Sequence, residues 1–181
     1  MKFVIVYGTT EGQTRRIARF CADRLADAGH AVELLPAAEA GDLELSRFDG
    51  AVLAGSLHIG AFQKELAAFA TARAAALRAM PTLFLAVSLA AAGQDAGDWA
   101  GLRACVERFS AASGWVPGQV AHVAGAFRFT QYDFFRTWAM RWIASEKGVA
   151  VTAGADTEFT DWAALGALLD TWAAGVTPRR G

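Results

Sequence analysis

The sequence predicts an α/β domain built on a doubly wound, five-stranded parallel sheet. Two observations indicate this fold: five short apolar stretches recur along the chain, and segments with apolar residues at helical spacing separate them. Strands that alternate with helices are joined by right-handed crossovers, which make the sheet parallel and cover both of its faces. A length of 181 residues fits a single domain, covering 1–181.

The expected strands are apolar and end where turn residues begin. They cover residues 2–7, 31–35, 50–56, 82–88 and 119–127, and the expected helices cover 13–28, 63–80, 99–113 and 161–174. Gly29 should end the first helix, and either Thr160 or Asp161 should cap the last one. An insertion at 128–155, with an amphipathic helical pattern at 129–144, separates the fifth strand from the last helix.

The loop after the first strand has the composition of a phosphate-binding loop. It reads Gly8-Thr9-Thr10-Glu11-Gly12-Gln13-Thr14. Its hydroxyls, its glycine and the free N–H groups of a helix N-terminus suit a phosphate. No lysine follows the glycine as in a Walker A loop, and the sequence has no GxGxxG pattern. A phosphate held without a cation points to a mononucleotide such as FMN. A simple helix-capping turn is the alternative interpretation.

The loops after the third and fourth strands, 56–62 and 88–93, lie at the same edge of the predicted sheet, where ligands bind in doubly wound folds. Their backbone amides and apolar side chains could enclose a planar ring, with Phe62 covering one face. His58 could tune a flavin or contact substrate, or could be a surface histidine without a role. The cofactor-binding candidates are Thr9, Thr10, Glu11, Gly12, Gln13, Thr14, Ser56, Leu57, His58, Ile59, Gly60, Phe62, Ser88, Leu89, Ala90, Ala91, Ala92 and Gly93.

The composition argues against several other classes of protein. A formal net charge of −1 gives no basic field for nucleic acid. No apolar run approaches the roughly 18–20 residues that span a bilayer, and the first residues do not form a signal peptide, so a cytoplasmic location is expected. Cys21 and Cys105 are far apart, without a CxxC or a Cys/His cluster, so we expect no disulfide and no metal site.

The three loops together resemble those of the flavodoxin superfamily. The resemblance covers nearly the whole chain and implies the strand order 2-1-3-4-5, with FMN phosphate in the first loop and the isoalloxazine between the other two. Within this superfamily the chain is similar to the menaquinone-dependent protoporphyrinogen dehydrogenase family of bacterial haem biosynthesis. The segments that carry this similarity are Glu11-Gly12-Gln13-Thr14-Arg15, Gly55-Ser56-Leu57-His58-Ile59-Gly60, Ala124-Gly125-Ala126-Phe127-Arg128-Phe129 and Thr160-Asp161-Trp162.

The resemblance implies an FMN-dependent enzyme that oxidises protoporphyrinogen IX to protoporphyrin IX with a quinone as acceptor. Flavin N5 would be the reactive centre, since the cofactor carries the hard chemistry, and no catalytic side chain is identified. Arg128 is the first candidate for holding the tetrapyrrole and His58 the second. The third loop departs from the family, because residues 90–95 are neutral to acidic where the family is richer in basic residues.

The insertion is rich in aromatic residues. Tyr132, Phe135, Trp138 and Trp142 share one face at helical spacing, with arginines beside them. Through residues 128–146, such a face could lie at the membrane–water interface on the inner side of the cell membrane, where a quinone is accessible. It could also bind a tetrapyrrole, with arginine pairing with the carboxylates. It could equally pack on the sheet edge or on a second subunit, so a homo-oligomer stays open.

Two other functions on the same fold stay open. An electron-shuttling flavodoxin docks transiently on protein redox partners, which charge complementarity steers, and the near-zero net charge speaks against a typical one. A quinone reductase that uses NAD(P)H would need a nicotinamide site, for which the sequence gives no signal.

Overall fold

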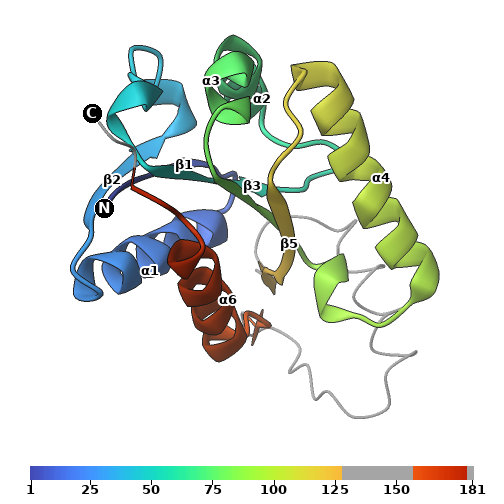
Figure 1. Cartoon of the computed structure of the whole chain (residues 1–181). Helices are drawn as coiled ribbons and strands as arrows, with labels where there is room; N and C mark the ends of the chain where they lie inside the picture. Colours follow the sequence, from blue (N-terminus) through green and yellow to red (C-terminus); the bar gives the residue numbers. More distant parts are fainter. Residues whose placement is uncertain (128–156, 179–181) are drawn as a thin grey trace.

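A five-stranded parallel sheet forms the centre of the protein (Figure 1). The computed structural model describes residues 1–127 and 157–178. The strands are β1 (Lys2–Gly8), β2 (Ala31–Pro36), β3 (Gly50–Ser56), β4 (Thr82–Ser88) and β5 (Gln119–Ala124), in the order β2-β1-β3-β4-β5. The predicted fold class and strand order are therefore confirmed. The predicted insertion at 128–155 lies outside the described residues.

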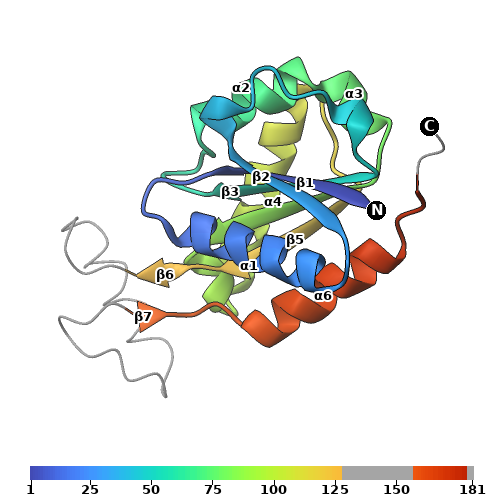
Figure 2. The same ribbon diagram turned by 90° about the vertical axis from the view of Figure 1, so that its left-hand side faces the viewer.

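Helices cover both faces of the sheet (Figure 2). Helices α1 (Gln13–Asp27) and α6 (Trp162–Ala174) pack on one face, whereas α2 (Lys64–Ala72), α3 (Ala74–Arg78) and α4 (Ala96–Ser113) pack on the other. Short 3₁₀ turns, η1 (Ala37–Glu39), η2 (Leu45–Arg47) and η3 (Ala90–Ala92), lie in the connections.

Successive residues of the central strands point into two separate apolar cores. On β1, Phe3 and Ile5 are buried with residues of α1 and α6, whereas Val4 and Val6 are buried with residues of α2, α3 and α4. A strand buried on both faces needs apolar residues at every position. This requirement explains why the strands read in the sequence as continuous apolar runs.

Two predicted elements are divided in the structure. The helix expected at 63–80 breaks at Arg73, which ends α2 and starts α3 with a non-helical φ of −108°. Its guanidinium donates a hydrogen bond to the carbonyl of Gly41. The strand expected at 119–127 ends at Ala124, and a two-stranded antiparallel sheet follows, formed by β6 (Ala126–Phe127) and β7 (Thr157–Glu158).

Side-chain caps fix the starts of two helices. Helix α4 begins three residues earlier than predicted, at Ala96, because the Asp95 carboxylate accepts a hydrogen bond from the Asp98 N–H at 2.9 Å. Asp161 caps α6 in the same way, through the Ala164 N–H at 2.9 Å. Thr160 is not the cap, because its hydroxyl bonds to the carbonyl of Ala124 at 2.7 Å.

Candidate functional site

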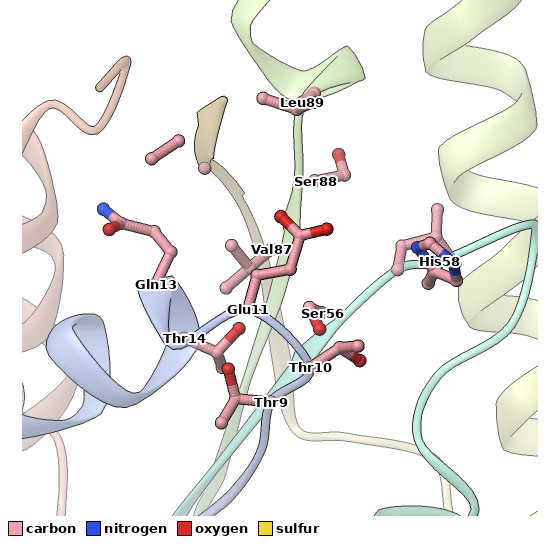
Figure 3. A pocket seen from close by; sticks show the side chains of 13 residues that line it. Thr9, Thr10, Glu11, Gln13, Thr14, Ser56, His58, Val87, Ser88 and Leu89 are labelled. Carbon is pink, nitrogen blue, oxygen red and sulfur yellow. The ribbon is translucent and has the colours of Figure 1, made fainter. Parts of the chain in front are cut away.

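A cavity lies at the carboxyl ends of β1, β3 and β4, where three loops meet (Figure 3). This is the edge at which doubly wound sheets bind ligands, close to the point between β1 and β3 where the strand order reverses. The residues that line it are Thr9, Thr10, Glu11, Gln13, Thr14, Ser56, Leu57, His58, Val87, Ser88, Leu89, Gly125 and Ala126.

The first loop presents an uncapped helix N-terminus to the cavity. Gly12 is the N-cap of α1, with a φ of 90° that glycine adopts without strain, and no side chain caps the helix. The Gly12 N–H donates to the Thr9 hydroxyl oxygen at 2.9 Å. Because that oxygen accepts, the Thr9 O–H is free to donate to a ligand. The first turn of α1 therefore offers N–H groups and the positive end of the helix dipole to an anion.

Thr14 supplies the most specific sign of a ligand. Its side chain is 1% exposed and lines the cavity, and its hydroxyl has no hydrogen-bond partner among the described residues. Leaving a buried hydroxyl unpaired costs about 1–3 kcal/mol. A phosphate oxygen in the first loop would accept this hydrogen bond and remove that cost, so the donor set fits a phosphate.

No lysine or arginine occurs among the described residues that line the cavity. Arg15, Arg16 and Arg19 instead line a separate groove on α1, together with Trp162. Hydroxyls, backbone N–H groups and a helix dipole would therefore hold the phosphate. This donor set suits the monoester of a mononucleotide, as the sequence predicted.

The second loop contains a tight turn that positions His58. The backbones of His58 and Ala61 exchange two hydrogen bonds, of 2.9 and 3.1 Å. Ile59 and Gly60 between them have positive φ values of 48° and 77°, as a type I′ turn requires. Ile59 is 86% exposed and Gly60 also lies outside the cavity lining. The Leu57 N–H donates to the Val87 carbonyl at 2.7 Å, which joins this loop to the end of β4.

The third loop contributes its first two residues to the cavity. Ser88 and Leu89 line it, and the Ser88 hydroxyl oxygen accepts a hydrogen bond from the Ala91 N–H at 3.2 Å. Ala91 and Ala92 line a different groove, between β5 and α6. Ala90 and Gly93 line neither of these two sites.

Phe62 packs in an aromatic cluster on the side of the sheet covered by α2 and α4. Its ring is half-buried and packs against Phe84 and Phe109, with centroid distances of 5.0 and 5.2 Å. It is not among the described residues that line the cavity, and its contact with a face of the ring stays a prediction. The members of the aromatic cluster are distant in the sequence.

The cavity also includes residues that the sequence analysis did not assign to cofactor binding. Val87 ends β4, and Gly125 and Ala126 follow β5. The Gly125 N–H donates to the Ser88 carbonyl at 3.0 Å, and its own carbonyl accepts from the Phe159 N–H at 3.0 Å. These backbone bonds bend the chain out of β5 and bring β6 to the cavity. The glycine at 125 was the only local signal for the bend.

A polar network joins the first loop to β7. The Gln13 amide donates to the Glu158 carboxylate at 2.6 Å and to the Thr160 hydroxyl at 3.0 Å. Arg16 forms an ion pair with the same carboxylate at 3.0 Å. Gln13 thus lines the cavity, while its side chain anchors α1 to the strand on which the chain returns from the insertion.

Some sequence predictions cannot be placed on this geometry. Arg128 and the aromatic segment at 128–146 lie outside the described residues, so their roles stay predictions. In residues 1–127 and 157–178, no group of histidine, cysteine, aspartate and glutamate side chains could hold a metal ion. In the same part of the chain, no helix combines the length and apolar character needed to span a bilayer.

Comparison with known proteins identifies the class. A solved flavodoxin from Streptococcus pneumoniae is similar in fold, with a TM-score of 0.58 and 19% identity, covering 97% of this chain and 100% of the other. The family model for the flavodoxin domain matches residues 4–151, and the chain therefore belongs to the flavodoxin domain family. Membership implies FMN as the cofactor, which the donor set of the cavity fits.

Two curated relatives carry a more specific name. Both are called protoporphyrinogen IX dehydrogenase (quinone). The protein from Escherichia coli K12 is 25% identical over 162 residues, covering 90% of this chain and 89% of the relative. The protein from Leishmania major is 27% identical over 182 aligned residues, covering 98% of this chain and 78% of the relative. Together with the family, these likenesses make the chain an FMN-binding oxidoreductase.

Proposed function

We propose that this chain oxidises protoporphyrinogen IX to protoporphyrin IX and transfers the electrons to a quinone. The observation that carries the proposal is the cavity, in which a helix N-terminus and an unpaired buried threonine hydroxyl converge on one point of a flavodoxin fold. The names of the two relatives, whose similarity extends over nearly the whole chain, supply the substrate class.

The strands that flank the predicted insertion support a large substrate beside the flavin. The chain leaves the described part after β6 and returns on β7, and Ala126 of β6 lines the cavity (Figure 2). The last described residues on either side of this connection, Phe127 and Thr157, are paired in the β6–β7 sheet, whose Ala126 lines the cavity. Arg128 directly follows β6 in the sequence, and we assign it to pairing with the carboxylates of the tetrapyrrole.

The chain's own residues divide into two groups in this proposal. Thr9, Thr14 and the first turn of α1 hold the phosphate end of FMN. His58 lies across the cavity from Gln13 and Thr14 (Figure 3), at the side left for the ring and the substrate. Glu11 and His58 are the ionisable side chains of the described lining. We assign His58 to contact with the substrate.

FMN, when bound, would accept hydride equivalents from the tetrapyrrole and deliver the electrons to the quinone. The conversion of protoporphyrinogen IX to protoporphyrin IX releases six electrons and six protons, and each quinone takes up two of each on becoming a quinol. Three quinone molecules therefore balance the oxidation of one tetrapyrrole. The loops contribute by orienting the flavin and by excluding competing reactions.

The test is an anaerobic absorbance assay with the FMN-loaded protein. Protoporphyrinogen IX is added in the dark, flavin bleaching is followed, and a menaquinone analogue is then added. We expect bleaching, its reversal by the quinone, and the appearance of porphyrin fluorescence. Free FMN at the same concentration is the control, because it reports oxidation that does not need the protein.

Two outcomes would contradict the proposal. If FMN binds but stays oxidised in the presence of protoporphyrinogen, the electron-carrier alternative replaces the enzyme. If NADH or NADPH bleaches the flavin at a rate comparable to or faster than protoporphyrinogen does, the quinone-reductase alternative replaces it.

A further inference from the structure

Gln63 lies beneath the cavity, between the first and second loops. A Cβ atom added to Gly8 at the end of β1 would lie 2.9 Å from Gln63 Oε1 and 3.0 Å from its Cβ. A Cβ added to Gly55 in β3 would lie 3.7 Å from the same Oε1. The glutamine side chain therefore packs directly on the ends of the two neighbouring strands.

The carboxamide of Gln63 hydrogen-bonds to both loops. Its Oε1 accepts from the Ser56 N–H at 3.1 Å. Its Nε2 lies within hydrogen-bond distance of the Thr10 hydroxyl oxygen at 3.1 Å, the Ser56 carbonyl oxygen at 3.0 Å, and the Ser56 hydroxyl oxygen. The amide has two N–H groups, so two of these three acceptors share one of them. These contacts connect residues that are 53 and 7 positions away in the sequence. One side chain thus sets the spacing between the loop predicted to hold the phosphate and the loop predicted to hold the ring.

These bonds also involve two hydroxyls of the cavity lining. Thr10 and Ser56 both line the cavity, and both hydroxyl oxygens accept from Gln63 Nε2. A hydroxyl that already accepts a hydrogen bond from an amide directs its own proton elsewhere. Because both residues line the cavity, their hydroxyls can donate to an anionic or carbonyl-bearing ligand there.

The same side chain does not serve its own helix. Gln63 occupies the N-cap position of α2, yet its side chain makes no capping hydrogen bond to that helix. A glutamine that stabilised only α2 would bond to the N–H groups of the first turn. All of its described polar contacts go to the two loops instead.

We propose that Gln63 is a positioning residue of the FMN site. It fixes the first and second loops relative to each other and orients the Thr10 and Ser56 hydroxyls as donors toward the cofactor. Gln63 does not line the cavity, so it acts through these two residues. The inference rests on the proposed binding of FMN, but not on the identity of the substrate.

The test compares FMN dissociation constants of the full-length protein by flavin fluorescence. Gln63→Met keeps the length of the side chain and removes its hydrogen bonds, and we expect affinity to fall roughly tenfold, as for the loss of about 1.4 kcal/mol. Gln119→Met is the matched control, because Gln119 is exposed at the far end of β5. It should leave the dissociation constant within about twofold, because less than about 0.5 kcal/mol is expected of a surface substitution.

A double-mutant cycle separates positioning from simple structural support. In a Thr10→Val, Ser56→Ala background, Gln63→Met should weaken FMN binding by less than about twofold, because the hydroxyls through which it acts are gone. An equal loss of affinity in both backgrounds would overturn the proposal. So would an unchanged affinity in Gln63→Met when the wild-type protein binds FMN.

If Gln63→Met fails to fold, as circular dichroism would show, Gln63→Glu takes its place. That variant keeps an acceptor for the Ser56 N–H but loses the donor to Thr10, and its charge opposes a phosphate. We expect FMN binding to weaken more than riboflavin binding. Equal weakening of the two would contradict an action through the phosphate loop. A wild-type protein that binds FMN but does not oxidise protoporphyrinogen overturns the proposed function and leaves this comparison intact.

Discussion

Replacing Thr14 by valine should change stability and cofactor affinity in opposite directions. The two side chains have nearly the same shape, and valine replaces the hydroxyl by a methyl group. In the described structure this hydroxyl is buried and has no partner. Its removal should therefore help the cofactor-free protein and harm the complex, a combination that simple loss of packing cannot produce.

The expected magnitudes follow from the burial of Thr14. An unsatisfied buried hydroxyl costs about 1–3 kcal/mol, so the cofactor-free variant should be more stable by up to this amount. A hydrogen bond to a charged phosphate contributes about 1.5–3 kcal/mol. Its loss corresponds to an increase of about 10- to 150-fold in the dissociation constant for FMN.

Two measurements check this prediction. Urea unfolding of the cofactor-free protein gives the free energy of unfolding, and titration with flavin fluorescence gives the dissociation constant. Thr71→Val is the matched control: Thr71 is exposed on α2, far from the cavity, and its hydroxyl bonds to the Ala67 carbonyl at 2.8 Å. That control should leave FMN binding unchanged.

The reasoning is refuted if Thr14→Val lowers the stability of the cofactor-free protein and leaves FMN affinity unchanged. That pair of results would mean that the hydroxyl already has a partner within the protein. Riboflavin, which lacks the phosphate, should bind the variant and the wild type equally well. A large loss of riboflavin affinity would place Thr14 at another part of the cofactor.

Three further predictions concern packing and pH. Gly55→Ala should lower the free energy of unfolding in urea by about 1–3 kcal/mol, because the added Cβ would lie 2.6 Å from the buried Leu66 Cδ2. The control is Gly41→Ala, which has open space around the added Cβ and should be neutral or slightly stabilising. Burial raises the pKa of the Cys21 thiol from 9.0 to about 12, so stability should fall as the pH rises above about 9 in unfolding experiments, and Cys21→Ala should flatten this decline. Burial lowers the pKa of His122 below its usual 6.5, so the free energy of unfolding should decrease as the pH falls below about 6.5. If a His122→Gln variant loses stability with falling pH as the wild type does, His122 is not the group responsible.

The sheet could be predicted because its signals are local. Each central strand is buried on both faces, so nearly all of its residues are apolar and the stretch is visible without knowledge of its partners. The first loop was equally visible, since the hydroxyls of Thr9, Thr10 and Thr14 and the glycine between them are neighbours in the sequence. The cavity confirms that the ends of β1, β3 and β4 meet there.

The side chains around the cavity could not be placed from local patterns. Phe62 lies in a loop that the sequence assigned to the ring, but its half-buried side chain packs against Phe84 and Phe109 and is not among the residues that line the cavity. Gln63 was read as the first residue of a helix, whereas its hydrogen bonds go to Thr10 and Ser56. In both cases the deciding partners lie on other elements.

The sequence by itself determined the order of strands and helices, the family, and the loop that suits a phosphate, because each depends on residues close together in the chain. Only the tertiary structure decided where β5 ends, which loop residues face the cavity and which side chain joins the loops. Those features depend on contacts such as the bond from the Gly125 N–H to the Ser88 carbonyl. Such contacts form only after the sheet has brought distant segments together, so no local pattern contains them.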